Sequence, residues 1–181
     1  MQPINKIYAL NLKARKEKRE RISNLLLKEA LCVPIEFVEA FDLRAIDVNL
    51  IHHWLSEQGA STYKNWRRKE EESFEGYNFG HYDDRDIKSA EVGCVLSHFY
   101  LWKNIASRNE TALILEDDAF WNSGALKQFL EESLPKCPTT DLLYLGRNKV
   151  SRKEEKPVDE EGRFVEPAFS YNTQSYIIGK E

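Results

Sequence analysis

The segment Thr111–Phe120, with the sequence TALILEDDAF, constrains the fold of this chain more than any other stretch. Residues Thr111–Leu115 are apolar or β-branched, which is typical of a short strand that is buried on both faces. Three consecutive carboxylates follow, Glu116, Asp117 and Asp118. Adjacent negative charges repel one another, and none of them can enter a dry core unpaired. A buried strand that ends in three carboxylates therefore indicates a cation site at its carboxyl end.

The nature of that cation follows from ligand chemistry. Carboxylate oxygens suit hard divalent ions such as Mg²⁺ and Mn²⁺, which often bridge carboxylates to phosphates. In open α/β sheets, ligands bind beyond the carboxyl ends of the strands. The alternative is a strand that runs into a solvated acidic turn, and an isolated LEDD motif gives the two interpretations about equal weight.

Length and composition predict one globular domain. The chain has 181 residues, of which 41% are hydrophobic, so it can bury a sizeable core. A net charge of −4 gives no electrostatic footprint for nucleic acid or for an anionic membrane. The sequence shows no apolar run of the roughly 20 residues that a membrane span needs, no signal peptide and no paired cysteines. We therefore expect a cytoplasmic protein, with peripheral attachment at the inner membrane surface left open.

Alternating strand and helix patterns predict an α/β fold. Strands over Ile4–Leu12 and Ile35–Ala40 flank a helix over Lys13–Ala30, which makes a parallel βαβ unit. The longest helix is predicted over Ser89–Arg108, with Ser89 as its cap. The other expected elements are a short helix over Ile46–Glu57, a polar loop over Ser56–Lys88, strands over Thr111–Leu115, Asp141–Leu145 and Ser175–Ile178, a helix from Asn122 or Ser123 to Leu134, and a flap or hairpin over Arg147–Pro167.

Three arginines, Arg15, Arg19 and Arg21, follow the first predicted strand, where a diphosphate could sit. A solvated helix face is the alternative for most of these residues, and we expect one of the three arginines, but not all three, to contact an anion. Asp42 follows the second strand, where it could hydrogen-bond a base or ribose or simply start a turn.

Glu91 and His98 lie two turns apart on a half-buried stripe of the helix predicted over Ser89–Arg108. A glutamate and a histidine on one half-buried stripe are candidates for a functional role. On residue type alone, a core histidine with satisfied hydrogen bonds is favoured about two to one over a functional one.

Two sequence pieces together carry a family resemblance. AEVGCVLSHFYLWKNI (Ala90–Ile105) is followed after a short gap by ALILEDDAF (Ala112–Phe120). This pair resembles glycosyltransferase family 25, the family of bacterial lipooligosaccharide galactosyltransferases and collagen galactosyltransferases. The pieces IYALNLKARKEKRERI, FVEAFD, DLLYLG and SYII add weaker similarity in the same order along the chain.

The resemblance implies a GT-A fold, a Rossmann-like α/β sandwich with a mostly parallel central sheet that binds a nucleotide sugar. Mn²⁺ or Mg²⁺ would bind with the donor diphosphate at the acidic motif, with Glu116 and Asp118 as the metal ligands. The residues implied at the nucleotide are Asn11, Arg15, Arg19, Asp42 and Ser97. The candidates for the catalytic base are Asp117, Glu91 and His98.

The implied activity is an inverting transfer of a hexose from a UDP-sugar to a glycan acceptor in cell-surface glycan biosynthesis, such as that of lipopolysaccharide. UDP-galactose is the expected donor, UDP-glucose the alternative, and no nucleic-acid partner is expected. Because family members usually continue further, residues 1–181 are expected to form a single glycosyltransferase domain without its C-terminal part.

Two other functions remain open. The chain could be a truncated, non-catalytic domain that binds a nucleotide sugar or a glycan, in which case the donor would bind without being consumed. It could also be another metal–phosphate enzyme, such as a hydrolase, which would release free sugar at full rate without an acceptor. The sequence has no P-loop, G-x-S-x-G or HExxH pattern, so the commonest other active-site motifs are excluded.

Overall fold

The structure, a computed structural model, describes residues 3–47, 49–50, 53, 88–149, 155–167 and 170–179. The chain divides into two compact units. We call Met1–Ala40 together with Leu101–Glu181 the sheet unit, and Phe41–Tyr100 the motif unit. Nearly all of the short helix predicted over 46–57 and of the loop predicted over 56–88 lies outside the described residues.

The sheet unit contains a five-stranded sheet in the order β2-β1-β3-β7-β4. Its strands are β1 (Lys6–Asn11), β2 (Ile35–Glu39), β3 (Ala112–Glu116), β4 (Leu142–Lys149) and β7 (Ser170–Ile178). Strand β1 pairs in parallel with β2 and β3, whereas β7 is antiparallel to both β3 and β4. Four strands therefore run in one direction, as expected for an α/β protein with a mostly parallel central sheet.

The helices are α1 (Lys16–Glu29), α3 (Ser89–Arg108) and α4 (Ala125–Gln128), and α4 continues as a π-turn over Phe129–Ser133 and a 3₁₀ turn over Leu134–Lys136. Two short strands, β5 (Lys156–Pro157) and β6 (Val165–Glu166), form a separate hairpin. The bounds of α3 are those predicted. Ser89 is wrong as its cap, because Ser89 is the first helical residue and the Glu91 carboxylate accepts the N–H of Lys88 at 2.8 Å.

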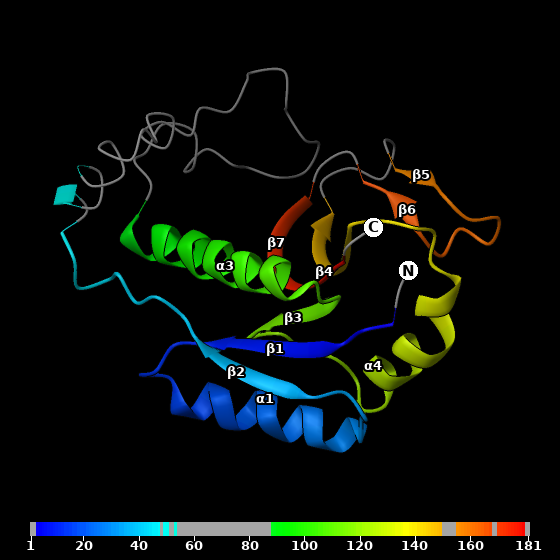
Figure 1. Cartoon of the computed structure of the whole chain (residues 1–181), viewed down its shortest axis with the longest axis horizontal. Coiled ribbons are helices and arrows are strands. Elements are labelled where there is room, and N and C mark those ends of the chain that lie inside the picture. The colour runs from blue at the N-terminus through cyan, green and yellow to red at the C-terminus, as the bar shows by residue number, and fades with distance from the viewer. Residues whose placement is uncertain are drawn as a thin grey trace. The chain divides into compact units, whose positions relative to one another are not determined.

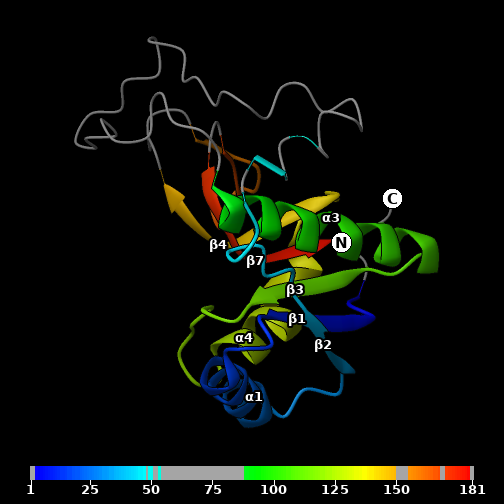
Figure 2. The same cartoon turned by 90° about the vertical axis from the view of Figure 1, so that its left-hand side faces the viewer.

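The core of the sheet unit has two layers because side chains alternate along each strand. On β3, Leu113 and Leu115 pack with α1 and α4, while Ala112 and Ile114 pack on the opposite face. There the carboxyl-terminal part of α3 covers the sheet through two buried side chains, Leu101 and Ile105. Figures 1 and 2 show α1 and α4 on one side of β1 and β3 and this part of α3 on the other.

No helix in the described part of the chain is both long enough and apolar enough to cross a membrane.

Tyr8 is fully buried on β1, and its hydroxyl donates a hydrogen bond of 2.6 Å to the Glu110 carboxylate. Burial, reinforced by this hydrogen bond, raises the pKa of Tyr8 above its ordinary value of 10.0. The neutral phenol thus stabilises the fold at neutral pH.

We expect the free energy of unfolding to fall as pH rises above about 10, because the unfolded chain then releases a proton that the folded chain retains. The stabilisation is complete below the pKa of the unfolded state and is lost as pH passes the raised pKa of folded Tyr8. Urea unfolding between pH 8 and 11 should show a steeper decline for the unsubstituted chain than for Tyr8→Phe. Equal slopes would contradict this account, and the comparison cancels the contributions of other groups that titrate in the same range.

Candidate active site

The three carboxylates lie at the carboxyl edge of the sheet. Strand β3 ends at Glu116, and the chain then turns so that the N–H of Ala119 donates to the Glu116 carbonyl oxygen at 3.0 Å. We call Glu116–Asp118 the acidic turn. Glu116 and Asp117 are half-buried and Asp118 is exposed. The sheet therefore presents carboxylates where ligands of α/β proteins bind.

Asp117 is fixed by three residues from the first strand and helix. Its carboxylate accepts hydrogen bonds from Asn11 Nδ2 at 2.9 Å and from Lys18 Nζ at 3.2 Å, the latter also an ion pair. Its carbonyl oxygen accepts a hydrogen bond from the Arg21 guanidinium. These contacts tie β1 and α1 to the acidic turn. Because Asp117 is the middle residue of the turn, they also hold the backbone from which Glu116 and Asp118 extend.

Glu116 is held from the other side of β3. The hydroxyl of Thr173, on the adjacent antiparallel strand β7, donates to Glu116 Oε1. Sequence reasoning did not single out Thr173. The only available signal was a hydroxyl two residues before the SYII run, and its relevance depends on β7 running antiparallel beside β3.

Asp118 has no hydrogen-bond or ion-pair partner among the residues that the structure describes. Its carboxylate projects from a turn whose middle residue is anchored, and it lies two positions from the Thr173-bound Glu116. Glu116 and Asp118 both carry carboxylates, the ligand type that Mg²⁺ and Mn²⁺ prefer.

Asn11, Arg15 and Arg19, which were predicted to contact the nucleotide, have different surroundings in the structure. Asn11 is buried, and its amide donates to the Arg15 carbonyl oxygen at 3.2 Å as well as to Asp117. Arg15 immediately precedes α1, and the guanidinium of Arg19 lies 4.4 Å from the centre of the Phe37 ring. Of the three arginines, Arg21 is thus the one in contact with the acidic turn.

In the motif unit, Asp42 is exposed and forms a forked ion pair with Arg44, with the Nε–Oδ1 distance at 2.7 Å. Ser97 is buried, donates to the Gly93 carbonyl oxygen at 2.6 Å and accepts the N–H of Phe41 at 2.8 Å. Ser97 therefore fastens the segment after β2 to α3 within this unit. A methyl group added at Gly93 would lie 2.5 Å from the Phe41 carbonyl oxygen, so the same crossing requires glycine.

Gly93→Ala is expected to lower the free energy of unfolding by about 1–3 kcal/mol, because the added methyl group displaces Phe41 from Ser97. In an open helix interior the same change would instead stabilise by about 1 kcal/mol. Urea unfolding decides between the two signs. Ser97→Ala is the matched comparison, since it removes the hydrogen bond without overpacking, and we expect it to cost about 1 kcal/mol. A stabilised Gly93→Ala chain would contradict the close approach.

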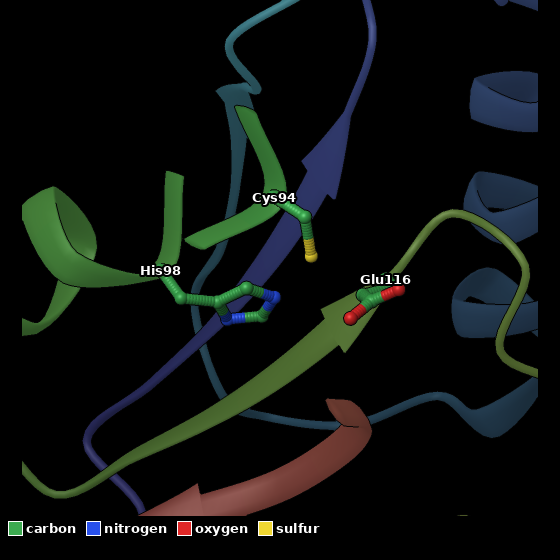
Figure 3. A group of neighbouring side chains, drawn as sticks. All are labelled: Cys94, His98 and Glu116. Atoms are coloured by element: carbon green, nitrogen blue, oxygen red, sulfur yellow. The ribbon is translucent and has the colours of Figure 1, made fainter. Parts of the chain in front are cut away.

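Further ligand-type side chains lie on α3. Cys94 and His98 are one helical turn apart, with Cys94 exposed and His98 buried, and Glu91 caps the start of the helix. Figure 3 shows Cys94 and His98 on α3 and Glu116 at the end of β3. Each of these three side chains offers one atom of a type that can ligate a metal ion. The sequence pattern places Cys94 on the same helix stripe as His98, but only His98 and Glu116 were predicted as site residues; the i, i+4 spacing of Cys94 and His98 was the available signal.

Comparison with known proteins gives a family for this architecture. The profile of glycosyltransferase family 25 (LPS biosynthesis protein) matches residues 4–180. The mouse protein named procollagen galactosyltransferase 2 is 30% identical over 182 residues, which cover 98% of this chain and 26% of that protein. An Aedes aegypti protein named glycosyltransferase 25 family member is 28% identical, covering 97% of this chain and 26% of the relative.

A human protein named inactive glycosyltransferase 25 family member 3 is 33% identical over 101 residues, covering 54% of this chain and 17% of that protein. The chain spans about a quarter of the length of the curated relatives that it matches along nearly its whole length. The profile match covers both the helix motif on α3 and the acidic turn. On this match, the chain belongs to glycosyltransferase family 25.

Proposed function

We propose that this chain carries the donor site of a metal-dependent glycosyltransferase, which transfers galactose from UDP-galactose to a glycan acceptor with inversion. The observation that carries the proposal is the acidic turn, anchored at the carboxyl edge of a mostly parallel sheet in a family 25 chain. The relatives named galactosyltransferases support galactose as the transferred sugar. A GT-A fold is part of the proposal, supported by the layered α/β sheet unit.

The roles at the donor site follow from the contacts of the acidic turn. Glu116 and Asp118 would hold Mn²⁺ or Mg²⁺, and the bound ion would offset charge on the leaving diphosphate. Thr173 orients Glu116, and Asn11, Lys18 and Arg21 orient the turn through Asp117.

The identity of the catalytic base is a separate part of the proposal. Asp117, Glu91 and His98 are the candidates for this role. His98 is the first to test, since histidine is the side chain that most often serves as a general base.

The proposal is tested by thermal unfolding of the chain with UDP or UDP-galactose, each with and without Mn²⁺, followed by transfer assays on galactose-accepting glycans. A ligand that binds only the folded state raises its apparent stability. We expect a nucleotide-induced rise in Tm that requires Mn²⁺, and transfer that is lost in His98→Ala.

Other outcomes separate the alternatives. Binding without transfer would support a non-catalytic domain, an outcome that the relatives named inactive make a specific second candidate. Release of free galactose at full rate without an acceptor would support a hydrolase. Absence of any nucleotide-dependent shift in Tm would overturn the donor site.

A further inference from the structure

A cavity of about 400 Å³ lies in the sheet unit beside the acidic turn. Its volume falls within the range of about 300–1,000 Å³ that is typical of small-ligand sites. It is lined by the end of β3, by residues 143–146 of β4, by the middle of β7, by Ala119–Trp121, by α4 with its π-turn, and by the chain before β6.

The cavity lies next to the proposed donor site. Leu115 and Ala119, the residues immediately before and after the acidic turn, both line it. Phe120 also lines it, and this large apolar side chain is 75% exposed. The cavity therefore borders the backbone at both ends of the acidic turn.

The lining combines aromatic walls with a polar edge. Phe120, Trp121, Phe129 and Phe164 supply aromatic surface, while Arg163, Gln174 and Ser175 supply hydrogen-bonding groups. A hexopyranose ring has the matching chemistry, because one face presents C–H groups and its rim presents hydroxyls. Aromatic surface with a few fixed polar groups is the usual composition of such a site.

The polar edge is held in place by Asp159. Its carboxylate accepts the Nε–H of Arg163 at 2.9 Å and the N–H of Phe164 at 2.9 Å. One carboxylate thus fixes both a charged and an aromatic wall of the cavity. Arg163 is exposed and also pairs with Glu161 at 3.2 Å, so it gives the cavity a charged rim.

We propose that this cavity binds one sugar ring of the acceptor glycan. The role of this sugar as an acceptor rests on the proposed function. The affinity of the cavity for a saccharide can be measured without any transfer reaction. The aromatic walls stack on the apolar face of the ring, and Gln174 and Arg163 bind its hydroxyls.

The test is saturation-transfer NMR and titration of the chain with methyl β-galactoside, methyl β-glucoside and lactose. We expect saccharide binding that Gln174→Ala weakens by about threefold to tenfold, the loss typical of one hydrogen bond. Phe129→Leu tests the aromatic wall with a side chain of similar apolar character. Gln128→Ala is the matched control, because Gln128 is exposed on α4, bonds Glu132 and does not line the cavity.

In transfer assays, the same Gln174→Ala change should raise the acceptor KM and leave the Mn²⁺-dependent stabilisation by UDP unchanged. Saccharide binding that is equal in Gln174→Ala, Phe129→Leu and Gln128→Ala would overturn the inference while leaving the donor site intact. Binding of octanol in place of every sugar would also overturn it. Loss of saccharide binding in Gln174→Ala in a chain that shows no response to UDP would support the cavity and overturn the proposed function instead.

Discussion

Asp118→Asn is expected to remove the Mn²⁺-dependent stabilisation by UDP-galactose and to lower transfer by about 100-fold to 1,000-fold, the range for losing one group that stabilises charge in the transition state. The substitution keeps the size of the side chain and removes its charge. Asp118 is exposed and has no partner in the described part of the chain. Without ligand, the free energy of unfolding should therefore stay within about 0.5 kcal/mol of its original value.

Asp117→Asn, one residue earlier, is expected to lower stability, in contrast to Asp118→Asn. The Asp117 side chain is 12% exposed and is hydrogen-bonded to both Asn11 and Lys18, so neutralising it weakens an anchored turn. We expect a loss of about 1–2 kcal/mol in unfolding free energy. Loss of transfer in Asp117→Asn at unchanged stability would support its catalytic role. Full transfer and a full Tm shift in Asp118→Asn would rule out Asp118 as a metal ligand.

The contrast between these two residues shows where sequence reasoning reached its limit. Three adjacent carboxylates after a buried strand predicted the carboxyl edge of the sheet, and β3 places them there. The letters LEDD could not separate their roles, because the contacts that do so come from Lys18 and Arg21, which are 99 and 96 residues away in the sequence.

Elements with a strong local pattern were predictable, and elements that depend on pairing were less so. Helix α3 has the predicted bounds because 20 residues with a helical apolar period specify it locally. Strand β7 begins at Ser170 and not at Ser175, because its early residues pair with β4 through the backbone. Those residues have no apolar alternation, so the sequence did not predict them as part of a strand. Ser97 shows the same limit, because its partner Phe41 is 56 residues away.

A buried carboxylate that the sequence did not reveal is expected to have the largest effect on stability. Glu29, at the end of α1, is 2% exposed. Its carboxylate accepts hydrogen bonds from Trp121 Nε1 at 3.0 Å, from the N–H of Gly124 at 2.8 Å and from the N–H of Lys127 at 2.8 Å. Because α1 is a charged helix with several similar residues, no local pattern marks this glutamate as the one that caps α4 and holds Trp121.

Glu29→Ala is expected to lower the free energy of unfolding by about 3–5 kcal/mol. Three donors lose their acceptor, each at a cost of about 1–3 kcal/mol where water cannot replace it, and the removed side chain leaves a cavity. This is a large part of the roughly 5–15 kcal/mol that stabilises a typical domain. Urea unfolding followed by circular dichroism measures the loss. Glu20→Ala on the exposed face of α1 is the matched control, with an expected change within about 0.5 kcal/mol.

Glu29→Gln separates the charge from the shape of this side chain. The amide oxygen can accept two of the three hydrogen bonds, but the amide nitrogen would face a donor, and the favourable charge at the start of α4 is lost. We therefore expect an intermediate loss of about 1–3 kcal/mol. Equal stability of Glu29→Ala and Glu20→Ala would show that water replaces the carboxylate. Because the N–H groups of Gly124 and Lys127 donate to Glu29, hydrogen exchange in Glu29→Gln should increase first at Gly124–Lys127, before the strands of the sheet. Trp121 and α4 also line the cavity beside the acidic turn, so the same change should loosen one wall of that cavity.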